Sequence, residues 1–520
     1  MWRGTRGEGA SWGRRDLHPR RVHARARVTK GRERAVFAPI PRVRHARAPP
    51  LTFDSVTFLC FLPLVFAIYW SLPTVRAQNL LLLVASYVFY GAWDWRFLGL
   101  LFLASCVDYF AGLGIAKGKH AKAWLALTLI NNLGILLTFK YLDWGITSFA
   151  ALMGHFGMAS DVATLGWILP VGISFYTFQT LSYGFDVYRK ELKPTHDFIA
   201  FLAFVAFFPQ LVAGPIERAT QLLPQFLGPR TFDPKKATDG ALQMLYGLII
   251  KVVIADRLAA IVNPAYAEAD TANPWSLLVA TWAFAFQIYG DFAGYSHIAI
   301  GASRLFGFSL MRNFAYPYFS LSPAEFWDRW HISLSTWFRD YLYIPLGGNR
   351  VGPIRRRFNV FLTFLVSGIW HGANWTFVAW GAYWGVLVAL FPRGARTEID
   401  KPMGKGRVPQ LSHALKAFVM FQVACVGWVF FRASSIEEAF TILESFTHLL
   451  TTTIPVGVFE PILPILLPLV AWEWWNRREA HGLTLRRTTV RGRVLTAFAA
   501  VLLVAAWGEV RTVPFIYFQF

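Results

Sequence analysis

Long apolar runs with almost no charge recur along this chain and constrain its fold more than any other feature. Val56–Trp70, Leu80–Tyr90 and Leu98–Val107 are three of them, and similar runs continue to the carboxyl end. With their flanking residues they approach the ~20 residues that cross a bilayer. Backbone polar groups in lipid must be satisfied internally, which favours helices. The sequence therefore predicts an all-α, polytopic integral membrane helical bundle with roughly ten to thirteen membrane-embedded helices, some of them broken by Pro or Gly.

Composition and charge agree with lipid as the solvent of this chain. Hydrophobic residues make up 55% and charged residues 16% of the sequence, and the mean hydropathy is +0.40. The net charge of +21 would indicate nucleic acid as a partner in a soluble protein. However, residues 1–50 carry 14 basic and 3 acidic side chains, a net charge of +11, which leaves +10 for the other 470 residues. That remainder suits the basic cytoplasmic loops of a membrane protein, so no nucleic-acid partner is expected.

The chain divides into a short basic segment and one membrane domain. Residues 1–50 have no apolar core typical of a signal peptide, and we expect a disordered basic extension that is a mis-assigned start or a dispensable tail. The alternative is electrostatic attachment to anionic lipid headgroups. Residues 51–520 form the predicted transmembrane domain. Its largest polar insert, 392–409, and the cluster Arg355–Arg357 are both expected on the cytoplasmic side.

The first region with candidate chemistry runs from Phe326 to Gly348. If it is one helix, His331, Ser335 and Arg339 lie on one polar stripe, opposite an aromatic and aliphatic face. Ionisable residues at membrane depth are costly, so each is a functional candidate. The competing interpretation is an interfacial amphipathic helix with a hydrated histidine.

The second region surrounds His371, the only side chain that titrates near neutral pH between Phe358 and Phe391. If the span begins at Phe358, His371 lies ~20 Å along the helix and is deep in the membrane. Its small neighbours Gly368, Gly372 and Ala373 would let a ligand or another backbone approach the ring. A structural histidine bonded to a neighbouring helix is the alternative. The cysteines Cys60, Cys106 and Cys425 show no metal-ligand spacing, and no metal site is expected.

These two regions carry a family resemblance. Arg329-Trp-His-Ile-Ser-Leu-Ser and Ser367-Gly-Ile-Trp-His-Gly-Ala-Asn-Trp, with the segment 338–350 between them, resemble bacterial membrane-bound O-acyltransferase (MBOAT) proteins, and the alginate O-acetyltransferase branch most closely. Supporting motifs are Phe53-Asp-Ser, Pro170–Gln179, Asp186-Val-Tyr-Arg, Phe208–Arg218, Asp291-Phe-Ala-Gly-Tyr-Ser and the closing Phe-Ile-Tyr-Phe-Gln-Phe. Two departures are His297, where Asp is expected, and Asp328, where a basic or amide residue is common. Both leave the two motif histidines intact.

The resemblance implies a multi-helix fold around a tunnel, an acyl donor such as acetyl-CoA on the cytoplasmic side, and an acceptor on the other face. It implies that His331 and His371 are the catalytic residues. Acyl transfer to a hydroxyl needs a base, and imidazole titrates in the useful range. We assign the general base to His371, while His331 orients the second substrate or shares the proton transfer. No tightly bound cofactor is expected.

Further residues are candidates for substrate binding. They are Arg329, Ser335, Asn374, Asp291 and the cluster Arg355, Arg356 and Arg357. Asn374, three residues after His371, would lie on a neighbouring helix face and offer polar support. The arginine cluster could receive the phosphates of CoA, and its alternative interpretation is a topology signal.

The acceptor stays open at this point. An exopolysaccharide such as alginate, another cell-wall polymer, or a hydroxyl on a periplasmic acyltransferase partner would all fit a multi-pass protein of the bacterial inner membrane. A different functional class also remains: a transporter or flippase for lipid-linked sugar or an acyl carrier, because broken helices and buried ionisable groups also mark transport pathways.

Overall fold

The apolar runs of the sequence fold into helices, and no strand occurs in the part of the chain that the structure describes. The computed structural model describes residues 51–158, 162–391, 410–484, 489–508 and 515–516. All of them belong to one compact unit, Ala48–Phe520. The predicted all-α architecture is confirmed, whereas the predictions for residues 1–50 and 392–409 lie outside the described residues.

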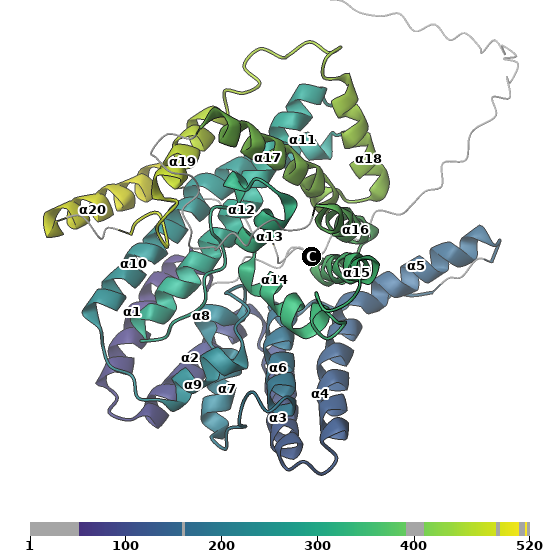
Figure 1. Ribbon diagram of the computed structural model, residues 1–520. Coiled ribbons are helices and arrows are strands. Elements are labelled where there is room, and N and C mark those ends of the chain that lie inside the picture. Colours follow the sequence, from purple (N-terminus) through teal and green to yellow (C-terminus); the bar gives the residue numbers. More distant parts are fainter. Residues whose placement is uncertain (1–50, 159–161, 392–409, 485–488, 509–514, 517–520) are drawn as a thin grey trace, which may run out of the picture. The chain divides into compact units, whose positions relative to one another are not determined.

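The amino-terminal part of this unit runs up to one long central helix (Figure 1). Its α-helices are α1 (Val56–Ser71), α2 (Val75–Asp94), α3 (Arg96–Ala116), α4 (Ala121–Leu136), α5 (Leu142–His155), α6 (Ile173–Tyr188), α7 (Phe198–Ala206), α8 (Phe208–Leu211), α9 (Ala219–Leu227), α10 (Pro234–Leu248), α11 (Asp256–Ala267) and α12 (Pro274–Leu305). Two π-helical turns lie inside longer helices: η1 (Leu137–Tyr141) joins α4 to α5, and η2 (Ile249–Ala255) joins α10 to α11. Such π-helical turns often mark functional sites.

The carboxyl-terminal part contains both histidine motifs. It consists of η3 (Pro317–Phe319), α13 (Pro323–Arg329), α14 (Ile332–Phe338), η4 (Arg339–Tyr343), α15 (Pro353–His371), α16 (Trp375–Leu390), α17 (Leu411–Arg432), α18 (Ile436–Ser445), η5 (Phe446–His448), α19 (Leu463–Asn476) and α20 (Val490–Trp507). The helix ends follow local capping chemistry. For example, Ser435 accepts a hydrogen bond from the backbone N–H of Glu438 at the start of α18.

Among the described residues, four helical stretches are long and apolar enough to cross a membrane. They are Arg96–Ala116, Ala121–His155, Leu411–Arg432 and Val490–Trp507, and the shorter apolar helices are Val56–Ser71, Phe198–Leu211 and Trp375–Leu390. Large apolar side chains such as Leu59, Phe110 and Leu502 are exposed on these helices, as expected for surfaces that face lipid. Multi-pass membrane organisation is therefore confirmed, and the number of ten to thirteen embedded segments stays a prediction.

Small residues bring two pairs of helices into backbone contact. On α15 and α16, a Cβ added to Gly368 would lie 2.3 Å from the carbonyl oxygen of Phe377 and 2.8 Å from Cα of Gly381. On α10 and α12, a Cβ on Gly247 would lie 2.5 Å from the carbonyl oxygen of Gly294. This is the small-residue packing by which membrane helices associate. The backbone of α16 thus makes the close approach predicted around His371, and it does so at Gly368.

Three buried polar side chains on α3, α4 and α6 pair with one another. Asn132 on α4 donates its amide to both carboxylate oxygens of Asp108 on α3 at 2.9 Å, and the hydroxyl of Thr180 on α6 donates to Asn132 Oδ1 at 2.7 Å. The three helices lie side by side in Figure 1. Interhelical hydrogen bonds of this kind hold membrane helices together where the hydrophobic effect cannot.

Candidate active site

The segment from Phe326 to Gly348 is not one helix, which corrects the prediction of a continuous polar stripe. Helix α13 ends at Arg329, His331 has a φ of 43°, and α14 starts at Ile332. A left-handed backbone at a non-glycine residue costs free energy and persists where surrounding structure enforces it. The chain therefore turns sharply at His331, which becomes the N-cap residue of α14 and is completely buried.

The backbone freed by this turn finds partners in the stretch that follows α12. The N–H of Ile332 donates to the carbonyl oxygen of Asn313 at 2.9 Å, and the N–H of Ala315 donates to the carbonyl oxygen of Arg329 at 2.9 Å. Non-helical backbone at membrane depth is tolerated where protein satisfies its polar groups. These bonds hold His331 in place from both sides of the turn.

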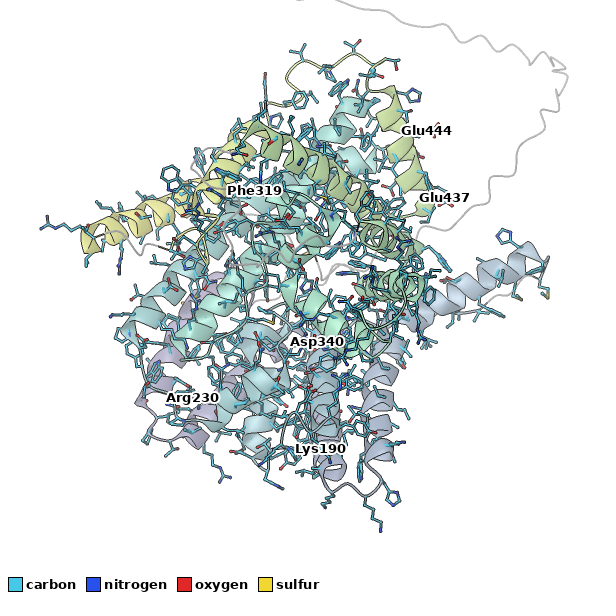
Figure 2. All side chains as sticks on the ribbon, viewed as in Figure 1. Lys190, Arg230, Phe319, Asp340, Glu437 and Glu444 are labelled. Atoms are coloured by element: carbon cyan, nitrogen blue, oxygen red, sulfur yellow. The ribbon has the colours of Figure 1, made fainter. Side chains whose placement is uncertain are left out.

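Helix α14 and the π-turn η4 are anchored to motifs that lie far away in sequence. Trp337 stacks on Phe178 of α6, with ring centroids 3.9 Å apart, and its indole N–H donates to the Phe178 carbonyl oxygen at 3.0 Å. The guanidinium of Arg218 lies 3.3 Å from a carboxylate oxygen of Asp340, which Figure 2 labels. Tyr341 donates to Asp186 at 2.6 Å. Several motifs that carried the family resemblance therefore position the helix that begins at His331.

His371 is the last residue of α15, and a second group of contacts fixes that helix end. Lys140, in η1, donates its ammonium to the carbonyl oxygens of Trp370 at 2.8 Å and His371 at 2.9 Å. The neighbouring Tyr141 hydroxyl donates to the carbonyl oxygen of Ile369 at 2.8 Å. The last carbonyls of a helix have no partner within the helix, so these bonds satisfy them.

The fold brings the two predicted histidines together. The imidazole centroids of His331 and His371 are 6.5 Å apart, although 40 residues separate them in sequence. Phe292 of α12 contacts His331 edge-on at 4.6 Å between centroids. Trp380 of α16 and Phe431 of α17 approach His371 at 4.9 and 5.4 Å. Both rings thus lie buried in an aromatic enclosure.

The polar contacts of His331 determine which of its nitrogens carries the proton. Asn313 Oδ1 accepts from the backbone N–H of Ser333 at 3.3 Å and from the Ser333 hydroxyl at 2.9 Å. A backbone N–H can only donate, so this atom of Asn313 is the oxygen, and Nδ1 of His331, 3.1 Å away, must donate to it. The other nitrogen, Nε2, then holds a lone pair, and it has no hydrogen-bond partner within the described ranges. It is able to accept a proton.

A cavity of about 40 Å³ adjoins His371. Lys140, Gly172, Phe175, Val212, Trp370 and His371 are among the residues that line it. The tunnel implied by the family resemblance stays a prediction. No cluster of three or more metal-ligating side chains occurs in the part of the chain that is described.

Three other predicted site residues lie near the two histidines in sequence but have contacts of their own. Arg329 forms an ion pair with Glu325 at 3.1 Å and donates to a backbone carbonyl oxygen at 3.3 Å. The hydroxyl of Ser335 lies 3.4 Å from the Trp330 carbonyl oxygen. Asn374 is not on a neighbouring face of the His371 helix, as we had predicted, because α15 ends at His371. Its side chain accepts from Thr376 N–H as the N-cap of α16 and donates to a carbonyl oxygen at 2.9 Å.

The remaining candidates occupy other places. Asp291 of α12 lies 2.8 Å from the ammonium of Lys251 and accepts a hydrogen bond from the backbone N–H of Ile516 at 2.6 Å. Arg355 to Arg357 lie within the first five residues of α15, where Arg355 and Arg357 are exposed and Arg356 is half-buried. They are separated from His371 by nearly the whole helix, ~24 Å at 1.5 Å per residue.

Sequence reasoning missed two residues that contact the histidine motifs. Lys140 offered a usable signal, because it is a charged residue within a 35-residue apolar helical stretch, and such residues are functional candidates by default. Asn313 offered none, since it lies in an irregular segment 18 residues before His331 and its role depends on the turn at that residue.

Comparison with known proteins agrees with this geometry. The membrane-bound O-acyltransferase family matches residues 51–428. A probable alginate O-acetylase AlgI of Pseudomonas aeruginosa is 42% identical over 402 residues, which cover 76% of this chain and 74% of that protein. A peptidoglycan O-acetyltransferase of Helicobacter pylori is 34% identical over 433 residues, covering 77% and 80%. A teichoic acid D-alanyltransferase of Bacillus subtilis is 30% identical over 241 residues, covering 42% and 58%. The chain belongs to the membrane-bound O-acyltransferase family and is a multi-pass membrane O-acyltransferase.

Proposed function

We propose that this protein transfers acetyl groups from acetyl-CoA on the cytoplasmic side of the bacterial inner membrane to hydroxyl groups of an exopolysaccharide such as alginate or of another cell-wall polymer. The acceptor is proposed because the relatives are named for alginate and peptidoglycan acetylation. A periplasmic acyltransferase that passes the group on to the polymer fits the same arrangement. Acetyl-CoA acts as a substrate, and no tightly bound cofactor takes part.

The observation that carries this proposal is the approach of the His331 and His371 rings to 6.5 Å in an aromatic enclosure. Transfer of an acetyl group forms a bond between the acceptor oxygen and the thioester carbon, and it releases the thiolate of CoA. The acceptor hydroxyl must lose a proton in that step, which a positioned imidazole accepts. Excluding water from the enclosure also protects the thioester against hydrolysis.

We assign the general base to His371 and proton sharing or substrate orientation to His331. His371 lies at the cavity wall, where a reacting group has room. The hydrogen bond from His331 Nδ1 to Asn313 fixes the tautomer of His331 and leaves a lone pair on Nε2. This nitrogen can therefore share the proton that His371 takes from the acceptor. The same proton then passes to the leaving thiolate.

The arginine cluster of residues 355–357 is a proposed contact for the phosphates of CoA. The cluster lies near the start of α15, and His371 is the last residue of that helix. The helix would therefore run from the phosphates of acetyl-CoA toward its thioester. Arginine side chains suit phosphate because their planar donors form paired hydrogen bonds. Its role as a cytoplasmic topology signal is compatible with this contact.

The test uses the purified protein reconstituted in vesicles with acetyl-CoA labelled in the acetyl group. Oligosaccharides of alginate and fragments of peptidoglycan are supplied as acceptors. We expect ester-linked label on one acceptor and the release of free CoA thiol in equal amount. A transporter or flippase would instead move a substrate across the vesicle membrane and leave the thioester intact. That result would overturn the proposal.

A further inference from the structure

The cavity next to His371 is matched in size to a very small acyl group. Its volume of about 40 Å³ is enough for roughly three waters, since one water needs about 10–15 Å³ of such space. An acetyl group also has three heavy atoms. Its walls combine apolar residues with three polar ones, Ser174, His371 and Lys140.

Lys140 is an unusual residue at this place. It lies in the π-turn that joins α4 to α5, within a continuous helical stretch of 35 residues. Within the described ranges, no acidic side chain forms an ion pair with it. Its hydrogen bonds go to the carbonyl oxygens of Trp370 and His371. A cation at the carboxyl end of a helix is favoured by the helix dipole, so these bonds hold the ammonium in a fixed position.

Lys140 has more N–H donors than its hydrogen bonds to the helix end use. An ammonium has three N–H donors, and two carbonyl oxygens at 2.8 and 2.9 Å take two of them. The side chain also lines the cavity together with His371. The remaining donor is thus available at the wall of the space where an acyl carbonyl would react.

We propose that Lys140 is a further catalytic residue, which donates a hydrogen bond to the acetyl carbonyl oxygen and stabilises the oxyanion formed on it. The inference rests on the acetyl transfer proposed above. The acceptor oxygen attacks the thioester carbon while its proton moves to His371, and the carbonyl electrons move to the oxygen beside Lys140. The intermediate then breaks its carbon–sulfur bond, and the thiolate takes the proton from His371. The products are the acetyl ester and free CoA.

The neighbouring Tyr141 provides a matched control, because it anchors the same helix end without adding charge to the cavity. Tyr141→Phe removes the bond to the Ile369 carbonyl oxygen. Lys140→Gln retains donors for the helix carbonyls but removes the cation, and Lys140→Met removes both. Loss of one oxyanion donor typically lowers kcat by about 10²- to 10³-fold. Because the interaction strengthens when the carbonyl oxygen becomes an oxyanion in the transition state, kcat should fall far more than KM for acetyl-CoA changes.

The experiment measures kcat and KM with acetyl-CoA for the full chain in vesicles, per correctly folded molecule. We expect a loss of kcat of that size in both Lys140 variants, and a kcat within a few-fold of the parent in Tyr141→Phe. Retention of kcat in Lys140→Gln, an equal loss in Tyr141→Phe, or failure of Lys140→Gln to fold would each assign Lys140 to helix anchoring and overturn the inference. If the parent protein itself transfers no acetyl group, the proposed function fails instead.

Discussion

Two pairs of buried histidines occur in this protein with the same ring separation and different surroundings. The centroids of His331 and His371 are 6.5 Å apart, and so are those of His297 and His481. His297 lies on α12 and interacts through Nδ1 with the amide of Gln243 at 3.0 Å. His481 lies 3.2 Å from a carboxylate oxygen of Asp239, which is partly exposed and also binds Arg304. Each ring of this second pair is therefore tied to a polar side chain.

The first pair is built in another way. Aromatic rings enclose it, the cavity of about 40 Å³ adjoins His371, and the side-chain amide of Asn313 contacts His331. The difference teaches that two close imidazoles do not by themselves identify a catalytic centre. The cavity beside His371 gives a reacting group room at the first pair, whereas the polar side chains bound to His297 and His481 give the second pair a structural role. Four predictions test this distinction.

The strongest test removes one imidazole of the first pair. We expect His371→Ala and His331→Ala each to insert and fold but to lose turnover by ~10²- to 10⁴-fold, the usual contribution of general acid–base catalysis. The measurement is turnover with acetyl-CoA and an acceptor, normalised to folded protein. Near-normal turnover in both variants would show that these histidines do not catalyse the reaction.

A second test removes the amide that fixes the tautomer of His331. Asn313→Ala leaves the buried Nδ1 proton without its acceptor, which costs about 1–3 kcal/mol and should lower turnover by roughly 5- to 150-fold. Ser296→Ala is the control, because Ser296 accepts from the Asn313 amide nitrogen at 2.9 Å and not from its oxygen. An equal loss in both variants would mean that Asn313 acts through general packing.

A third test acts on the helix contact behind His371. Gly368→Ala places a methyl group against the backbone of α16, and overpacking of this kind costs about 1–3 kcal/mol of stability. Gly145→Ala is a matched change on α5, where an added Cβ would meet no atom within 4 Å. Thermal unfolding in detergent should show a lower midpoint for the first variant and an unchanged or slightly higher one for the second. Equal midpoints would contradict the close packing of α15 on α16.

The smallest effect on catalysis is expected in the second histidine pair. His297→Ala loses the contact with Gln243 and should reduce stability by ~0.5 to 3 kcal/mol, as is typical of point mutants. Turnover per folded molecule should stay close to that of the parent. If His297→Ala lost as much turnover as His371→Ala, the distinction between the two pairs would fail.

Much of this molecule could be predicted because the signals are local. The apolar runs Val56–Trp70 and Leu98–Val107 became α1 and α3, since hydrophobic length alone predicts a membrane helix. His371 was identified because a titratable group in an apolar span is costly to bury and is therefore a functional candidate. The helix break at His331 could not be predicted, because it depends on two backbone hydrogen bonds to a segment distant in sequence. One joins Ile332 to Asn313 and the other joins Ala315 to Arg329, and no local pattern encodes either.

The sequence by itself determined that the chain is an all-helical membrane protein and that His331 and His371 are the residues to examine. Only the tertiary structure decided that their rings meet, that Asn313 fixes one tautomer, and that Lys140 holds the end of the helix that carries the other. The physical reason is the range of the interactions. Apolar runs and charge are properties of neighbouring residues. These contacts instead join side chains from η1, the segment after α12, the start of α14 and the end of α15, which only the folded chain brings together.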